Sequence, residues 1–506
     1  MNHKFSIALL ISTIVFNLFV ACSQPTVPAE STSVNTLPDI YPDYVNVTVP
    51  CNICPMNFYV KGCDEAVARL SAGQLSYTYG EGTDIIIPED EWVELLASAK
   101  GDAITVEVFA RGDAEWKAYR KFSINVADEP IDPYISYRLI QPSYVSYEDL
   151  AIVQRNITNY DEEDIYNNLS ITTEKDGQCI NCHSYQNYST ERMLFHMRQA
   201  HGGTMIYDKG NLLKVNLKTD STISAGVYPA WHPTLDIIAF STNKTGQIFH
   251  TKDRNKIEVQ DTYSDLVLYN VETNELSTVR NDTTELEVFP TWSPDGKTLF
   301  YCSAHFEYAD TSLTHEVEMI RRYKEVKYSI YSMPFNAQTQ TFGQSTLVYD
   351  AAALGKSATL PRLSPDGQYL VFAEGEYGCF HVWHNDADIH LLKLVNGQWT
   401  PQPQAMDGLN SGRSESYPSF SSNGRWIMCD SRRDDGNYTR PYISYFDKSG
   451  HCHKAFELPN RNPHHLIRLL KSFNRPEFMK EPVRTNHRTL TAKAKTEALQ
   501  AKQIVR

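Results

Sequence analysis

The chain has 506 residues, which is long enough for two or three domains with cores of their own. Hydrophobic residues make up 41% and charged residues 21% of the sequence, a balance that excludes global disorder. The formal net charge is −14, and this argues against nucleic acid as a partner because nucleic-acid recognition depends on basic patches.

The first 22 residues have the pattern of an export signal. Lys4 precedes an apolar run that ends at Cys22. The pattern resembles a bacterial lipoprotein signal, which implies that Cys22 is acylated and anchors the protein in the membrane. A plain secretory signal and an uncleaved anchor are the alternatives, and both also place the chain across the inner membrane. We therefore expect an outer-membrane lipoprotein of a Gram-negative cell envelope that faces the periplasm, with residues 23–39 as a flexible tether rich in Ser, Thr and Pro.

Residues 40–127 are predicted to form a small β-sandwich-like domain, because short strand-like runs alternate with Pro and Gly. Cys51, Cys54 and Cys63 lie in this domain. A Cys-x-x-Cys pair with one further Cys predicts a disulfide that leaves a third thiol over. The alternative is a set of three zinc ligands that lacks a fourth.

Residues 128–185 are predicted to be a linker that carries the sharpest local motif, Cys179-Ile180-Asn181-Cys182-His183. Cys-x-x-Cys-His is the signature of covalent c-type haem attachment. The spacing places both sulfurs on one helical turn, facing the haem vinyl groups, and the next residue directs its imidazole at the iron. We thus predict one covalent haem c, with thioethers at Cys179 and Cys182 and with His183 as the proximal iron ligand.

Other interpretations of this motif remain open. The two cysteines can form a structural disulfide beside a bystander histidine, a redox-active dithiol that lacks a thioredoxin-like context, or part of a crowded zinc site. The leading candidate for the distal iron ligand is His196, whose alternative role is that of a strand residue packed inside a blade. The other candidates for the distal ligand are Met193, Met197, His201 and Met205.

Four segments of the second half repeat one pattern and decide the fold. They begin at Tyr228, Phe289, Leu360 and Tyr417. Each continues with Pro, an apolar residue two positions on, a turn of the Ser-Pro-Asp-Gly type and an apolar strand, although the first has His-Pro-Thr-Leu as its turn. Pro presets the turn, Asp bonds back to the backbone and Gly supplies the positive φ. Repeats at roughly 55–70 residues predict a β-propeller.

These repeats resemble the TolB-like (PD40, WD40-like) repeats of bacterial β-propellers. The resemblance implies a mainly β protein with a propeller of about six blades over residues 186–460, the sixth blade coming from the linker or from C-terminal strands. Residues 461–506 are predicted to be a basic C-terminal extension that is disordered at its end.

Two functions compete at this point. The first is electron transfer by an envelope lipoprotein, in which the propeller docks a protein partner such as a redox protein. The alternative is a TolB-like binding or scaffold protein of the envelope that holds no haem. An enzyme with an open haem site is disfavoured, because no catalytic base stands near the motif.

Overall fold

A computed structural model describes residues 25–113, 115–142, 149–170 and 178–505, which form two compact units. The predicted signal segment and Cys22 lie outside the described residues. Within these ranges, no helix has the length and apolar character needed to cross a membrane.

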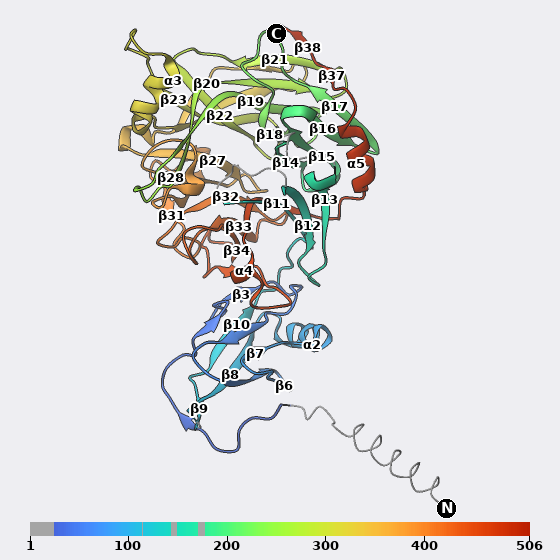
Figure 1. Ribbon diagram of the computed structural model, residues 1–506, viewed down its shortest axis with the longest axis vertical. Helices are drawn as coiled ribbons and strands as arrows, with labels where there is room; N and C mark the ends of the chain where they lie inside the picture. The colour runs from blue at the N-terminus through green and yellow to red at the C-terminus, as the bar shows by residue number, and fades with distance from the viewer. Residues whose placement is uncertain (1–24, 114, 143–148, 171–177, 506) are drawn as a thin grey trace, which may run out of the picture. The chain divides into compact units, whose positions relative to one another are not determined.

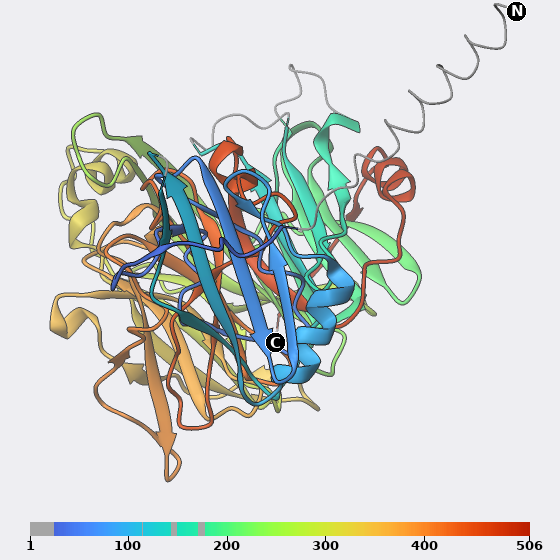
Figure 2. The same ribbon diagram turned by 90° about the horizontal axis from the view of Figure 1, so that it is seen from below.

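The first unit comprises described residues of 25–46 and 55–126 together with 461–464. Its main sheet contains β5 (Glu65–Ala72), β6 (Leu75–Tyr79), β8 (Ala103–Gly112), β9 (Glu115–Ala118) and β10 (Phe122–Val126). A second sheet contains β2 (Ile40–Tyr41), β4 (Phe58–Val60) and β7 (Asp84–Ile85). Helix α2 (Glu89–Ala99) packs its apolar face, centred on Trp92 and Leu95, against the main sheet (Figure 2). The unit is therefore mainly β with one packed helix. Part of the predicted tether is also a strand, because β1 (Thr32–Ser33) pairs with β9.

The second unit contains six antiparallel blades, which confirms the mainly β propeller (Figure 1). Blade 1 contains β36 (Ser472–Met479), β11 (Tyr134–Ile140), β12 (Ala151–Asn156) and β13 (Glu162–Asn167). Blade 2 contains β14 (Ile180–Gln186), β15 (Ser189–Met197), β16 (Gly203–Asp208) and β17 (Asn211–Asn216). Blade 3 contains β18 (Val227–Trp231), β19 (Ile237–Phe249), β20 (Ile257–Asn270) and β21 (Glu275–Arg280).

The remaining blades follow in chain order. Blade 4 contains β22 (Glu285–Trp292), β23 (Thr298–His305), β24 (Ser329–Asn336) and β26 (Thr346–Tyr349). Blade 5 contains β27 (Ser357–Leu363), β28 (Tyr369–Gly375), β29 (Asp388–Val395) and β31 (Gln404–Ala405). Blade 6 contains β32 (Glu415–Phe420), β33 (Trp426–Ser431), β34 (Arg440–Tyr445) and β35 (Phe456–Glu457). The C-terminal strand β36 pairs with β11, so the two ends of the propeller sequence close the ring in blade 1.

The innermost strand of every blade carries the same irregularity. Two residues of that strand are skipped in the pairing ladder, and the first of them has a positive φ between 49° and 56°. The six skipped pairs are Cys182-His183, Tyr228-Pro229, Phe289-Pro290, Leu360-Pro361, Tyr417-Pro418 and Arg475-Pro476. Six equivalent bulges mark six equivalent blades, because a bulge of this kind re-aims the strand at the same point each time.

Two predicted boundaries differ from the structure. The 128–185 segment is not a linker, because it supplies three strands of blade 1 and begins blade 2. The 461–506 segment is not disordered over its described length. Beyond β36 it forms helix α5 (His487–Ala494), β37 (Leu499–Gln500) paired with β17, and β38 (Lys502–Ile504) paired with β21. Lone strands without a Pro-Asp-Gly turn give too little local signal to be recognised as blade edges.

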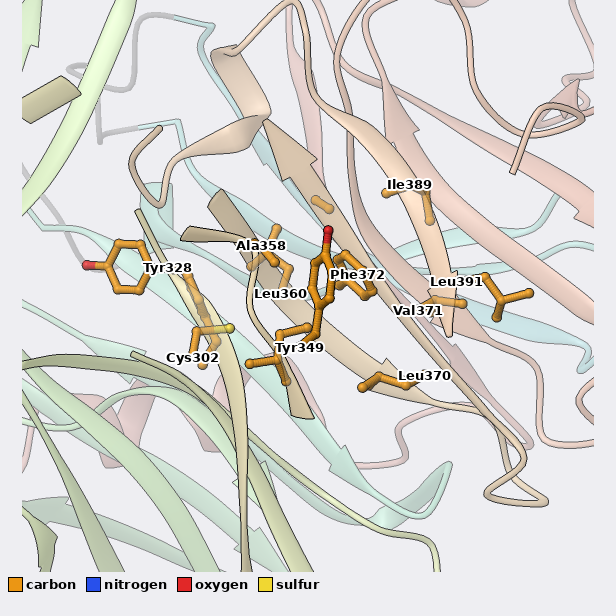
Figure 3. Close-up of a cluster of buried hydrophobic side chains, with 14 of the residues drawn as sticks. Cys302, Tyr328, Tyr349, Ala358, Leu360, Leu370, Val371, Phe372, Ile389 and Leu391 are labelled. Carbon is orange, nitrogen blue, oxygen red and sulfur yellow. The ribbon is translucent and has the colours of Figure 1, made fainter. Parts of the chain in front are cut away.

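Apolar side chains fill the space between neighbouring blades. Between blades 4 and 5, Tyr349, Phe372 and Leu370 belong to one buried cluster (Figure 3). Full burial of such side chains stabilises the fold by about 1.5–3 kcal/mol each. Cys302 and Cys429 occupy equivalent strands and are fully buried free thiols.

Candidate functional site

The inner strands line the propeller axis, along which cavities lie on either side of a narrow ring. The ring is formed by the first residues of five of the six bulges and by the prolines that follow four of them, and only about 30 Å³ of space remains between them. Residues that precede the ring, such as Asn181 and Asn474, line a cavity of about 300 Å³, the axial chamber. Residues that follow it, such as Tyr185 and Phe478, line a cavity of about 410 Å³, the opposite mouth.

The axial chamber is cationic. Arg138 from β11, Arg198 after β15 and Arg475 from β36 line it, together with the amides of Asn181 and Asn474. No Asp or Glu is among the described residues that line this chamber. This composition stands out because Asp and Glu outnumber Lys and Arg by 61 to 47 in the whole sequence.

Neutral groups hold two of these guanidinium groups in place. Arg138 donates from Nη1 to the carbonyl of Ile180 at 3.1 Å and from Nη2 to Oδ1 of Asn474 at 2.7 Å. Arg475 donates from Nη2 to the carbonyl of Pro229 at 3.1 Å. These bonds to neutral acceptors orient the two guanidinium groups, and Arg138 keeps its positive charge unpaired by any of them.

Acidic partners offset only part of this charge. Arg475 Nε donates to Glu477 at 3.0 Å, and Arg362 binds the same carboxylate oxygen at 3.1 Å. One carboxylate thus serves two arginines. Burial raises the pKa of the neighbouring Asp430 well above its usual range, and the carboxyl of Asp430 accepts a hydrogen bond from the backbone N–H of Arg475 at 2.9 Å. The exposed Arg198 makes no ion pair with any residue that the structure describes.

The Cys-x-x-Cys-His segment lies in the innermost strand of blade 2, not in the helical turn that the motif predicts. Cys182 occupies the ring position that carries Tyr, Phe or Leu in four other blades. His183 stands where the other five blades have Pro. The imidazole is fully buried, and burial lowers the pKa of His183 to about 3, so the ring is neutral. Cys179 and Cys182 are free thiols that line the axial chamber, whereas His183 does not line it.

This arrangement does not fit a c-type haem. Thioether attachment and iron ligation need both thiols and the imidazole on one side of the backbone, but here only the thiols reach the chamber. Among the described residues, no group of three or more His, Cys, Asp or Glu side chains has the geometry of a metal site.

Most of the candidate distal ligands pack or form hydrogen bonds within blade 2. Met193, Met197 and Met205 are buried in an apolar cluster that also contains Cys179. His196 is a buried strand residue whose Nδ1 lies 3.2 Å from Thr204 Oγ1, as its alternative interpretation predicts. His201 follows β15 in a short 3₁₀ turn and is half-buried.

The predicted disulfide among Cys51, Cys54 and Cys63 is not formed. None of the three is bonded to another cysteine. The Cys51 thiol donates to the carbonyl of Asp128, the Cys63 thiol donates to that of Val60, and Cys54 is buried.

The arginines of the chamber were missed in the sequence because they come from three distant segments. One signal was present. Arg475-Pro476 has the same residue-Pro form as the repeats that begin at Tyr228 and Phe289, with Arg in place of the apolar residue. A sixth repeat at that point would have placed one cation at the axis.

No protein-family model matches the sequence, and a search of curated proteins finds no match. Solved structures with a similar chain course include TolB from Acinetobacter baumannii, at 13% identity and a TM-score of 0.42 over 77% of this chain and 85% of that one. An oligogalacturonate lyase from Vibrio parahaemolyticus matches at 13% identity and a TM-score of 0.30, over 60% of this chain and 84% of that one. The β-propeller domain of the Trilobed protease from Pyrococcus furiosus matches at 9% identity and a TM-score of 0.24, over 70% and 68% of the two chains. The assignment of a six-bladed propeller rests on the strand pairing of this chain itself.

Proposed function

We propose that this protein is a binding protein of the bacterial cell envelope whose propeller holds an anionic ligand in the axial chamber. One observation carries the proposal: in an acidic protein, the described residues that line a cavity of about 300 Å³ include three arginines and no acidic side chain. That volume is at the lower end of the range for small-molecule sites. The envelope location and the lipid anchor rest on residues 1–22 and stay predictions.

The chemistry of recognition follows from the donors. Guanidinium groups bind carboxylate and phosphate oxygens through paired, charge-assisted hydrogen bonds. Each such bond contributes about 1.5–3 kcal/mol, or about 10- to 100-fold in Kd. The amide groups of Asn181 and Asn474 can complete the shell around the anion.

Calorimetric titration with inorganic phosphate and sulfate at low ionic strength tests this function. We expect binding by the full chain and a loss of at least about 10-fold in affinity for Asn181→Asp, which places a carboxylate in the chamber without a change of size. Asn396→Asp, in an exposed turn, is the matched control and should bind as the parent does. Thermal unfolding of both variants checks that they fold. Failure of the parent to bind either anion, or unchanged affinity in Asn181→Asp, would contradict the proposal.

The Cys-x-x-Cys-His motif favours a second function, covalent haem attachment for electron transfer to a redox protein of the envelope. In that case His183 must leave its buried position between the blades and turn to the same side as the two thiols. Expression with haem-attachment machinery, followed by acid–acetone extraction, separates the two functions. A c-type Soret and α band that survives extraction supports the haem protein, and its absence supports the anion-binding protein.

A further inference from the structure

A second basic cavity adjoins the axial chamber. We call it the basic cleft, and its volume is about 980 Å³. The cationic or titratable nitrogen side chains that line it are His196, Arg198, His201, Lys214, Lys218 and Lys495. Glu497 is the one acidic residue among its described lining residues.

The two cavities share a wall. Arg198 and Thr245 line both of them. Arg198 follows β15, while Thr245 lies on the long strand β19, whose next residues, Gly246 and Gln247, continue into the chamber. A ligand in the chamber that contacts Arg198 therefore lies next to the cleft, because the same exposed guanidinium lines both cavities.

Neutral acceptors hold two of the three lysines of the cleft, as they hold two of the three arginines of the chamber. Lys214 is buried and donates from Nζ to the carbonyls of Ala494 at 2.8 Å and Thr496 at 2.9 Å, at the end of helix α5. Lys218 donates to the carbonyl of Ile223 at 3.0 Å. Lys495 is exposed at the end of the same helix. The cleft thus presents two lysines held by backbone carbonyls and further exposed cations, and Glu497 is the one acidic residue among its described lining residues.

We propose that the ligand is an elongated polyanion, with one terminal anionic group in the axial chamber and further phosphate or carboxylate groups along the basic cleft. This inference rests on the proposed function and names its ligand class. A single small anion binds in the chamber only and makes no contact with the cations of the cleft. A linear polyanion contacts the cations of the chamber and those of the cleft. Once its terminal group is bound in the chamber, binding of the next group in the cleft is intramolecular.

Binding of inorganic phosphate and of tripolyphosphate by the full chain tests the inference. We expect tripolyphosphate to bind at least about 10-fold more tightly than phosphate to the parent protein. The double variant Lys218→Gln with Lys495→Gln should lose that advantage and keep its phosphate affinity, because both lysines lie outside the chamber. Lys297→Gln with Lys448→Gln removes the same charge from two exposed sites on other blades and is the matched control.

The outcomes separate the two proposals. Phosphate binding without a gain for tripolyphosphate, or a gain that survives in the Lys218/Lys495 variant, overturns the polyanion and leaves the chamber function intact. If neither anion binds, the chamber function fails as well. Acetate and a tetraglutamate peptide form a parallel carboxylate series, and a gain with length in one series alone identifies the anionic group.

Discussion

The two cavities along the propeller axis differ in the charge and the aromatic character of their lining. In the opposite mouth, Arg362 is paired with Glu477, and aromatic side chains such as Trp231 and Trp292 line the cavity. In the axial chamber, two or three residues earlier on the strands, arginines face the cavity without a lining carboxylate. In this propeller, therefore, the reactive and charged side chains stand where a blade departs from its repeat. Cys182 and Arg475 replace the apolar residue that begins the bulge, and Arg362 and Glu477 follow the bulge in their strands.

Loss of the Glu477 carboxylate should give the largest change in the free energy of unfolding. This carboxylate binds one arginine that lines the axial chamber and one that lines the opposite mouth. Glu477→Gln leaves Arg362 and Arg475 without their shared anion, and because these groups are only partly buried, loss of the bonded carboxylate costs about 1–3 kcal/mol. Urea unfolding measures the change. The variant Glu376→Gln, at an exposed position, is the control. A loss of unfolding free energy below about 1 kcal/mol for Glu477→Gln would show that the ion pairs of Glu477 with Arg362 and Arg475 do not stabilise this part of the axis.

The same carboxylate predicts how stability depends on pH. Burial opposes ionisation of Glu477, but Arg362 and Arg475 outweigh it and hold its pKa below the ordinary value of 4.5. A lowered pKa stabilises the folded state fully above pH 4.5, and this contribution is lost as the pH falls through the lower folded value. Unfolding free energies measured from pH 6 downward should decline less steeply below pH 4.5 in Glu477→Gln than in the parent. Equal slopes would contradict the ion-pair account.

A smaller effect is expected from Asp261, a buried carboxyl near Arg198 that does not line the chamber. Burial raises the pKa of Asp261 to about 7, and Asn243 Nδ2 donates to its carboxyl at 2.6 Å. Asp261 lies near enough to Arg198 for that charge to favour its ionised form. As the pH rises through 7, its new negative charge should weaken sulfate binding by about 5-fold, or about 1 kcal/mol.

Sulfate suits this measurement because its own charge is constant across the range. Asp261→Asn should flatten the profile, and the exposed Asp220→Asn should leave it unchanged. The stability of the parent should also fall with rising pH between 3.8 and about 7, because over that range the folded state retains a proton that the unfolded state loses. A sulfate affinity that does not vary with pH would show that the charge of Asp261 does not influence anion binding in the chamber.

The smallest effect is predicted for His183→Pro. Five other blades carry Pro at this position, and His183 has no partner in the pairing ladder of β14. We expect a change in unfolding free energy within about 1 kcal/mol, since a compatible Pro also restricts the unfolded chain. His183→Ala, which lacks that restriction, should be less stable than His183→Pro. A strong loss of stability in His183→Pro alone would show that blade 2 does not follow the repeat.

Sequence reasoning succeeded where the repeat is complete and failed where it is degenerate. Turns of the Pro-Asp-Gly type after Phe289 and Leu360 predicted the propeller, because they determine both the turn and the strand that follows. Cys182-His183 and Arg475-Pro476 stand at the same structural position but lack that turn, so the first was predicted to lie in a helical turn and the second went unnoticed. The chamber itself was not predictable, because ring closure alone brings Arg138, Arg198 and Arg475 together.

A crystal of the full protein soaked in selenate tests the central claim most directly, since the anomalous signal of selenium locates the anion without reference to function. We predict a peak in the axial chamber within hydrogen-bonding distance of Arg138, Arg198 and Arg475, with free thiols at Cys179 and Cys182. A chamber without selenate, or one that holds a haem bonded to both cysteines with His183 on the iron, would contradict the account.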